Sequence, residues 1–377
     1  MNADQARAAL RTALGAHAPV WLDPPILQPA AVYLELSGED IRRRAFLIDD
    51  ASHGALCLRP DMTVPVVRMA FDQPKLAPVV GYDGLVFRRQ SPGSERESEF
   101  VQVGAEWLGD GPMEVATEAA IVRAALEGCR AAGVEPALKL GDVGVLAGFV
   151  AALGLEEPWP QRVLRALARP GGLAALRAEK PANFEDEGAG LAEALAGLTQ
   201  EHAEAALRDM LAHARITAIG GRPVAEIAQR LRQRGRLAAA APPSAAQYDL
   251  LDALTHIDSA DGLERAGKLA ESKALKNAAP AKAALERASA RMAALRAGGA
   301  LPSACSFAPG LGRTLAYYDG FVFELEAPAL RERASLGGGG RYDGLARALW
   351  PANRAAPKAL RAAGFALRPQ RLAEAAP

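Results

Sequence analysis

The sequence predicts an α+β protein in which an antiparallel sheet is flanked by helices and interrupted by a mainly helical insertion. Two observations carry this prediction. Apolar stretches typical of strands occur in residues 1–143 and again in 297–377. Residues 144–296 between them are rich in Ala, Leu, Arg and Glu, and their apolar residues recur at helical spacing. Separate runs of strands and helices indicate the α+β class, with 1–143 and 297–377 forming one discontinuous core.

The first part of the core is predicted to contain helices, strands and one long hairpin. In chain order these are a helix over 3–15, strands over Ala31–Leu36, Ala45–Ile48, Val79–Arg89 and Phe100–Leu108, a helix over Pro112–Gly133 and a strand over Pro136–Gly141. The polar loop Gln90–Glu99 separates the third and fourth strands, so these two are expected to pair as an antiparallel hairpin.

The middle of the chain is predicted to be helical, and strands return near its end. Two helix faces in the insertion are marked by apolar residues three or four positions apart: Leu191, Leu195 and Leu198, and then Val224, Ile227 and Leu231. After the insertion, further strands are expected over Ser306–Ala308, Phe321–Leu325 and Ala363–Leu367. The glycine run 337–340 lies between the last two strands and is compatible with a simple turn.

Composition excludes several classes of protein. Lys and Arg together number 44, as do Asp and Glu, so the chain lacks the strong positive charge of most nucleic-acid-binding domains. The longest uncharged apolar run, Val143 to Leu155, is too short to span a bilayer. Three widely spaced cysteines and no signal sequence favour a reducing cytoplasm. Neither the cysteines nor the five histidines have metal-ligand spacing, so no metal or other cofactor is expected.

Four segments carry side chains that could form a binding site. They are Leu58–Pro65; the stretch from Phe87-Arg88 through Arg96 to Glu106; Gly312–Gly320; and the glycine run with Arg341–Gly344 and Gly364–Leu372. Each has a structural interpretation when taken alone. Asp61 could cap a helix, the glycines could form a turn, and the paired tyrosines Tyr317 and Tyr318 could serve packing.

Taken together, the segments suggest a site for a zwitterionic amino acid with a basic ring. Gln102 and Glu106 are four residues apart on one predicted strand, so they face the same side and can accept an imidazole N–H or an ammonium group. The planar guanidinium of Arg313 suits a carboxylate. Asp61 and Thr63 can complete the grip on the ammonium group.

These motifs resemble those of histidyl-tRNA synthetase, and the resemblance covers nearly the whole chain. Leu58–Val64 is similar to the family's L-R-P-E-x-T segment, and Phe87–Glu106 is similar to its motif 2. Gly312–Tyr318 is similar to its histidine-specific R-G-L-D-Y-Y motif, and Gly364–Leu372 to a degenerate motif 3. The resemblance implies a class II aminoacyl-tRNA synthetase fold. It also implies a histidine site of eight residues: Asp61, Thr63, Arg88, Gln102, Glu106, Arg313, Tyr317 and Tyr318.

The departures from the family pattern concern mainly the ATP side of that site. Gln90 replaces an acid that normally meets the adenine amino group, and Ala316 replaces the aspartate of the histidine motif. Arg368 replaces a glycine at a point of close approach to the nucleotide, where a long side chain should crowd the ligand. Arg88, Arg96 and Arg371 survive from the family's arginines, and Arg96 and Arg371 are expected to mark a vestigial nucleotide site.

The chain stops soon after Leu372, so no anticodon-binding domain is expected. A core of this kind with the segment L-R-P-D-M-T-V-P resembles the regulatory subunits of ATP phosphoribosyltransferase, which act at the first step of histidine biosynthesis. The resemblance implies a non-catalytic protein that activates a short-form catalytic subunit and mediates feedback inhibition by histidine. It further implies a dimer through the region near Pro29, a hetero-octameric complex, and no interaction with tRNA or membranes.

Two enzymatic alternatives stay open at this point. The surviving arginines Arg88, Arg96, Arg313 and Arg371 are compatible with a free-standing synthetase-like enzyme that activates an amino acid with ATP. A charging enzyme that has lost only its anticodon domain is the third reading, and the near-neutral charge argues against it.

Overall fold

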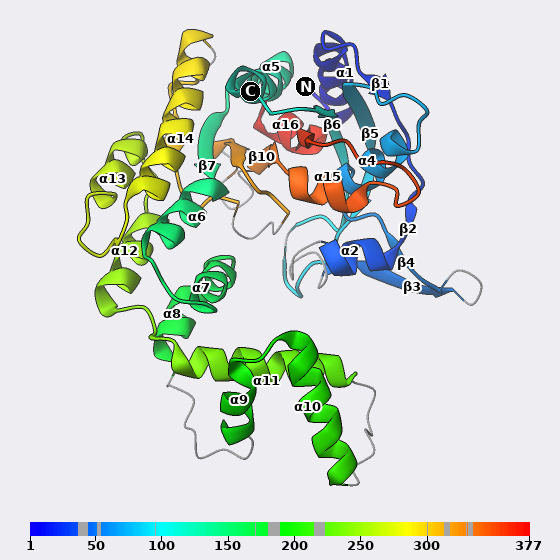
Figure 1. Cartoon of the computed structure of the whole chain (residues 1–377). Coiled ribbons are helices and arrows are strands. Elements are labelled where there is room, and N and C mark those ends of the chain that lie inside the picture. Colours follow the sequence, from blue (N-terminus) through cyan, green and yellow to red (C-terminus); the bar gives the residue numbers. More distant parts are fainter. Residues whose placement is uncertain are drawn as a thin grey trace. The chain divides into compact units, whose positions relative to one another are not determined.

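The computed structural model describes residues 1–36, 44–50, 54–94, 96–169, 171–179, 189–214, 223–299, 301–312, 317–328, 330 and 335–377. The chain divides into two compact units (Figure 1). The first comprises Met1–Gly148, Ala253–Glu271 and Ala279–Pro377, and the second comprises Phe149–Asp252 and Ser272–Ala278. The helical segment 144–296 is therefore shared between both units, and its boundaries as a separate insertion stay a prediction.

The first unit is built on an eight-stranded sheet with the order β1-β5-β6-β11-β10-β9-β7-β8. Its strands are β1 (Val20–Trp21), β5 (Val79–Phe87), β6 (Glu99–Asp110), β7 (Ala137–Asp142), β8 (Cys305–Phe307), β9 (Phe321–Glu326), β10 (Ser335–Arg341) and β11 (Leu360–Leu367). The six central strands are antiparallel, whereas β1 and β8 pair in parallel at the two edges. The antiparallel sheet and the hairpin β5–β6 confirm the prediction from sequence.

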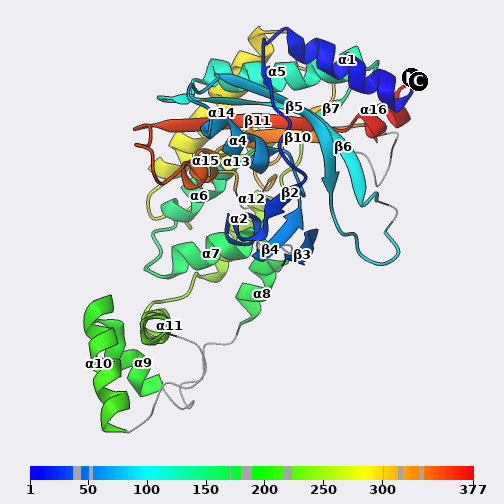
Figure 2. The same ribbon diagram turned by 90° about the vertical axis from the view of Figure 1, so that its right-hand side faces the viewer.

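Helices cover both faces of this sheet (Figure 2). One group packs over one face: α1 (Ala3–Gly15), α5 (Val115–Ala131), α14 (Ala279–Ala297) and α16 (Pro369–Ala375). The other face carries α4 (Thr63–Phe71) and α15 (Asp343–Leu349). Between this second face and its helices lies an apolar core that includes Val67 and Phe71 of α4, Val86 of β5 and Leu345 of α15. The unit also contains α13 (Gly262–Leu269).

A smaller sheet of three antiparallel strands lies in the same unit, and one prediction in this region is wrong. The strands are β2 (Leu27–Pro29), β3 (Phe46–Asp50) and β4 (Gly54–Leu58), in the order β2-β4-β3. The stretch Ala31–Leu36, predicted as a strand, belongs to helix α2 (Ala30–Leu36). Ala30 and Tyr33 are both fully buried, so the buried positions are three residues apart, as in a helix.

The glycine run does not form a turn. Gly337 to Gly340 lie within β10, which pairs with β9 on one side and β11 on the other. A strand of this composition lets neighbouring side chains lie directly over its backbone. This property shapes the candidate site described below.

The second unit is helical. Its elements, with the two helices that cross its boundaries, are α6 (Val143–Ala152), α7 (Trp159–Leu167), α8 (Gly172–Ala178), α9 (Ala189–Ala196), α10 (Gln200–His213), α11 (Val224–Ala239) and α12 (Ala245–Thr255). The two apolar helix faces expected from the sequence meet in one core. Its buried residues are Leu195, Ala203, Leu207 and Ala228, and its partly buried neighbours include Leu191, Leu198, Val224, Ile227 and Leu231. Across the described ranges of both units, no helix is both long enough and apolar enough to cross a membrane.

Candidate functional site

The register of the large sheet places Glu106 next to glycines of the two strands that follow β6 across the sheet. Glu106 on β6 pairs with Gly364 on β11, which in turn pairs with Gly340 on β10. A Cβ at Gly364 would lie 1.8 Å from Glu106 Oε2, and a Cβ at Gly340 would lie 2.9 Å from the Tyr318 ring. Glycine is therefore required at both positions, because Glu106 and Tyr318 occupy the space that other side chains would fill.

Glu106 is fully buried and is held by three hydroxyl groups. Thr63 Oγ1 donates to Oε1 over 2.8 Å, and Tyr342 OH donates to Oε2 over 2.5 Å. Tyr82 OH lies 3.2 Å from Oε1 and shares its one hydrogen atom between this oxygen and the carbonyl oxygen of Phe365, 2.9 Å away. Burial raises the pKa of the Glu106 carboxyl from 4.5 to about 7, although all three hydroxyl groups act to lower it. The side chain can therefore exchange a proton near neutral pH.

Asp61 provides a second buried carboxylate, with one of its two oxygen atoms unused. Oδ1 accepts the backbone N–H of Val64 over 3.0 Å, so Asp61 does help to cap the first turn of α4. Oδ2 is buried and meets no hydrogen-bond donor from the described part of the chain. Burial, the largest effect, raises the pKa of Asp61, and the Val64 N–H and the charge of Arg88 oppose it. A buried oxygen of this kind is poised to accept a hydrogen bond from a ligand.

Gln102 and Glu106 lie on the same face of β6, as the sequence predicted. Gln102 is buried, and its Oε1 accepts the backbone N–H of Met62 over 3.2 Å. Because Met62 lies between Asp61 and Thr63, this bond ties the start of α4 to the strand that carries Glu106. The structure thus brings Asp61, Thr63, Gln102 and Glu106 together.

Tyrosine rings form one wall of the site. The rings of Tyr317 and Tyr318 lie 4.7 Å apart, and Tyr317 meets Tyr342 edge-on at 6.2 Å. Burial raises the pKa of Tyr318, and the negative charges of Glu106 and Asp61 add to the effect. The charges of both carboxylates therefore reach Tyr318, whose ring also lies against Gly340 of β10.

The remaining predicted residues lie at different distances from this pocket. Arg88 is half-buried, and its Nε donates to the carbonyl oxygen of Pro60, directly before Asp61. Arg96 is exposed in the loop between β5 and β6. Arg313 and Ala316 lie outside the described residues, so the expected partner of a ligand carboxylate stays a prediction.

The predicted nucleotide side is filled by the protein's own arginines. The Arg368 guanidinium lies over the ring of Phe100 at 4.3 Å, and that of Arg88 approaches the same ring at 5.4 Å. Burial lowers the pKa of Arg368 to about 9, with further contributions from the positive charges of Arg88 and Arg371. A planar group that would stack on Phe100 therefore meets Arg368 in its place.

Arg371 and Gln90 are also engaged by protein groups. Arg371 is 2% exposed, and its guanidinium forms ion pairs with Glu97 at 2.6 Å and Glu374 at 3.0 Å. The Gln90 carboxamide accepts from Arg44 over 3.1 Å and donates to the carbonyl of Glu97 over 2.9 Å. Both side chains therefore have a structural role, since they hold the hairpin of β5 and β6 in place.

Two residues around Glu106 were missed by sequence reasoning. Tyr82 OH donates to the carbonyl of Phe365 over 2.9 Å as well as lying near Glu106, and Tyr342 makes the shortest bond to the carboxylate. Tyr342 directly follows the glycine strand and Arg341, but nothing local indicates that it faces Glu106. Its position two strands away from β6 across the sheet becomes visible only once the register is known.

The arrangement can bind a small ligand with an N–H donor at one end and a cationic group at the other. Glu106 can accept the N–H, and Asp61 Oδ2 can accept the cation. Within the described ranges, no group of three or more His, Cys, Asp or Glu side chains is placed to hold a metal ion.

The chain is similar to known proteins in sequence and in fold. The family model described as histidyl-tRNA synthetase matches residues 3–253 and 208–372. Curated relatives from Brucella anthropi and Brucella ovis, both named "ATP phosphoribosyltransferase regulatory subunit", are 36% and 35% identical over 345 and 344 residues. In both cases 89% of this chain and 89% of the relative are covered.

Solved structures show the same fold. A protein from Bacillus halodurans, titled "ATP phosphoribosyltransferase regulatory subunit/histidyl-tRNA synthetase", superposes with a TM-score of 0.65 at 20% identity, covering 99% of this chain and 78% of that one. A histidine–tRNA ligase subunit from Alicyclobacillus acidocaldarius gives a TM-score of 0.60 at 20% identity, covering 98% and 91%. The predicted class II synthetase-like α+β fold is thereby confirmed.

Proposed function

This chain belongs to the family of ATP phosphoribosyltransferase regulatory subunits. We propose that it binds histidine around Glu106 and that this binding lowers the activity of a catalytic subunit. The chain is the regulatory rather than the catalytic member of the pair, in agreement with the names of its curated relatives. Its proposed task is to activate a short-form catalytic subunit at the first step of histidine biosynthesis and to make that step sensitive to histidine.

Asp61 Oδ2, which meets no hydrogen-bond donor among the described residues, is the observation that supports histidine most directly. A buried carboxylate oxygen without a donor, close to the carboxylate of Glu106, would be satisfied by the ammonium group of a ligand. Glu106 would accept an imidazole N–H, and Tyr318 would meet the other ring nitrogen. Asp61, Thr63 and Gln102 would surround the ammonium group, while Arg313 is proposed to pair with the ligand carboxylate.

Histidine binding without ATP activation is the expected outcome, because Arg368 covers Phe100 on the nucleotide side. Two measurements separate the regulatory reading from a synthetase-like enzyme. Calorimetry with histidine should detect binding to the isolated protein, and ATP–pyrophosphate exchange should show no histidine-dependent signal. A clear exchange signal would contradict a purely regulatory role.

Histidine affinity is expected to rise about fourfold between about pH 6.5 and about pH 8, because Glu106 must be ionised to accept the imidazole N–H. The pKa of about 7 places this change near neutrality. The stability of the protein without histidine has the opposite pH dependence. Because folding raises the pKa of the Glu106 carboxyl, its protonation stabilises the folded state at low pH, and this stabilisation is lost as the pH rises through about 7.

Calorimetry at the two pH values, in buffers with different ionisation enthalpies, measures both the affinity and the proton released. The Glu106→Gln variant is the control, because it lacks the titrating group and should show little change in affinity over the same interval. An equally strong pH dependence in that variant would assign the proton to another group.

The Arg371→Ala variant is expected to lose about 1–3 kcal/mol of stability and to keep its histidine affinity within about twofold. The buried guanidinium of Arg371 forms ion pairs with Glu97 and Glu374. Because the side chains of both glutamates are about one-third exposed, water can partly replace the guanidinium as their partner in the variant. Urea unfolding and histidine calorimetry measure the two effects. Arg96→Ala, on the exposed loop, is the matched control and should change neither; a large loss of affinity in a folded Arg371→Ala protein would place Arg371 in the working site.

Self-association through the small sheet is proposed as well. The strand register places Leu27, Pro29, Phe46, Ile48, Leu56 and Leu58 on one face, opposite the buried Gln28 and Cys57. Leu27 is 49% exposed and Ile48 38%, so this apolar face could be covered by a second copy of the chain. Sedimentation should show that Ile48→Glu is monomeric, whereas Leu47→Glu, the adjacent residue on the opposite face, keeps the dimer.

The proposed partner is thus a short-form catalytic subunit within a larger complex such as a hetero-octamer, with histidine as effector and with no role for tRNA or membranes. The cytoplasm is the proposed compartment, since Cys57, Cys129 and Cys305 are all free thiols, as is usual in a reducing environment.

A further inference from the structure

Helix α11 in the second unit has one face closed by packing and another left open. Its apolar residues pack into the core shared with α9 and α10. Gly235 lies so close to α9 that a Cβ would stand 2.0 Å from the carbonyl oxygen of Ala192. The helix is therefore fixed against α9.

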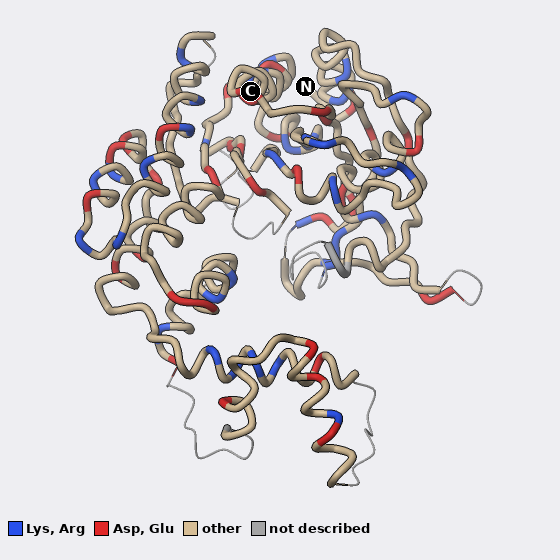
Figure 3. Tube along the Cα trace, in the orientation of Figure 1, with Lys and Arg blue, Asp and Glu red and all other residues tan. Residues whose placement is uncertain are grey.

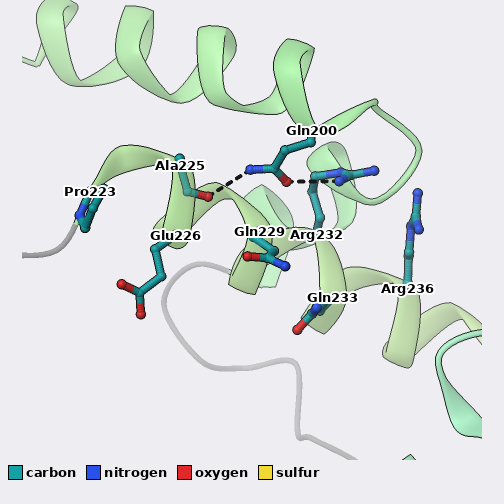
Figure 4. A pocket seen from close by; sticks show the side chains of 8 residues that line it. All are labelled: Gln200, Pro223, Ala225, Glu226, Gln229, Arg232, Gln233 and Arg236. Carbon is teal, nitrogen blue, oxygen red and sulfur yellow. Dashed lines mark hydrogen bonds between the residues drawn. The ribbon is translucent and has the colours of Figure 1, made fainter. Parts of the chain in front are cut away.

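The open side carries a stripe of two glutamines and two arginines. Gln229, Arg232, Gln233 and Arg236 follow the spacing i, i+3, i+4, i+7, which places them on one face of the helix. Together with Gln200, Pro223, Ala225 and Glu226 they line a groove of about 480 Å³ (Figure 4). The positive charges along α11 are visible in Figure 3.

The groove is organised by hydrogen bonds and contains an unused donor. Arg232 Nη1 donates to Gln200 Oε1 over 3.1 Å, and Gln200 Nε2 donates to the carbonyl of Ala225 over 2.8 Å. Arg236 Nε donates to the carbonyl of Ala196 over 3.0 Å. Arg232 Nε is buried and has no acceptor among the described residues. A buried donor left without an acceptor is costly, so an incoming oxygen atom would be favoured there.

We propose that this groove docks an extended acidic segment of a protein partner. Arg232 and Arg236 are one helical turn apart, about 6 Å along the axis. Alternate residues of an extended peptide are about 6.6 Å apart, so two carboxylates on the same side of such a segment can reach both guanidinium groups. The carboxamides of Gln229 and Gln233 offer both donors and acceptors, which match the peptide N–H and C=O groups.

The lining favours a peptide over a nucleic acid. Among the described residues that line the groove none is aromatic, so these residues offer no surface on which bases could stack. The carboxamide oxygens of Gln229 and Gln233 find hydrogen-bond donors on a peptide backbone but none on a phosphate. If the partner is the catalytic subunit, the proposal rests on the proposed function. The groove itself can be tested without that assumption.

A fluorescent peptide that alternates Glu and Ser, titrated with the full chain and followed by anisotropy, tests the groove alone. We expect the affinity for the peptide to decrease as the salt concentration rises. In the Arg232→Gln/Arg236→Gln variant the affinity should be lower by at least about tenfold. Arg165→Gln/Arg208→Gln removes the same charge from exposed positions on α7 and α10 and should change affinity less than about twofold. A Gln229→Glu/Gln233→Glu variant repels the peptide without removing either arginine, and it decides the matter if the arginine variant fails to fold.

Equal peptide affinity in the wild type and in both groove variants would overturn the proposal, as would tighter binding of a thymidine oligonucleotide than of the peptide.

Sedimentation with the short-form catalytic subunit then tests whether this subunit is the partner. We expect the groove variants to form a weaker complex, while their affinity for histidine, measured by calorimetry, stays unchanged. If the wild-type chain formed no complex, the proposed function would fail and the peptide titration would still judge the groove. A complex equally tight in the groove variants would contradict docking of the catalytic subunit at this site.

Discussion

Glu106→Gln is expected to bind histidine about tenfold to a hundredfold more weakly than the wild type, a loss of about 1.5–3 kcal/mol. The buried carboxylate is the proposed acceptor of the imidazole N–H, and a neutral carboxamide is a weaker acceptor in the same place. The replacement keeps the shape of the side chain against Gly364 and leaves an oxygen for the hydroxyl groups of Thr63, Tyr82 or Tyr342. Calorimetry with histidine measures the loss directly.

Glu99→Gln is the matched control, because Glu99 is exposed on the same strand β6. It should leave histidine affinity unchanged. In the complex with the catalytic subunit, Glu106→Gln should blunt inhibition by histidine and preserve activation, because feedback requires the effector to be bound whereas activation does not. Unchanged histidine sensitivity in a folded Glu106→Gln complex would place the feedback site elsewhere.

Asp61→Asn is expected to weaken histidine binding by about tenfold to a hundredfold while leaving stability unchanged or slightly raised. Asparagine can still accept the Val64 N–H through its oxygen, so the helix cap is kept. Its NH₂ group would then face the ligand ammonium in place of the unpartnered oxygen. Burial raises the pKa of Asp61, which means that the empty protein bears a cost for this charge that the variant removes.

A ligand without the ammonium group separates the two carboxylates. Imidazolepropionate should bind equally to the wild type and to Asp61→Asn, whereas Glu106→Gln should weaken it. Asp72→Asn, at the exposed opposite end of α4, is the matched control for Asp61→Asn. If Asp61 only caps the helix, Asp61→Asn will bind histidine as the wild type does.

Elements with clear local patterns could be predicted from the sequence. The helix over 3–15 and the hairpin of β5 and β6 were predicted nearly to their ends, because helix punctuation and alternating strand residues are local signals. Ala31–Leu36 was predicted wrongly, since a short apolar run does not distinguish a strand from a helix. The glycine run was ambiguous for a related reason: glycines have no side chains whose periodicity could reveal a strand.

The candidate site was predictable only in part. Gln102 and Glu106 share one strand, so their common face follows from the period of two residues. Tyr342 contacts Glu106 from 236 residues away, and Arg371 contacts Glu97 from 274 residues away. Such contacts depend on the strand register, which local sequence patterns do not determine. The same holds for the unpartnered oxygen of Asp61, which is a property of the folded pocket.

Reconstitution with a short-form catalytic subunit is the decisive experiment for the proposed regulatory function. Phosphoribosyl transfer from phosphoribosyl pyrophosphate to ATP should be measured for each chain alone and for the mixture, over a titration of histidine. We expect no turnover by this chain alone, a rise in activity on mixing, and inhibition by histidine that is lost with Glu106→Gln. Turnover by this chain free of its partner, or inhibition of the mixture that is indifferent to Glu106, would contradict that function.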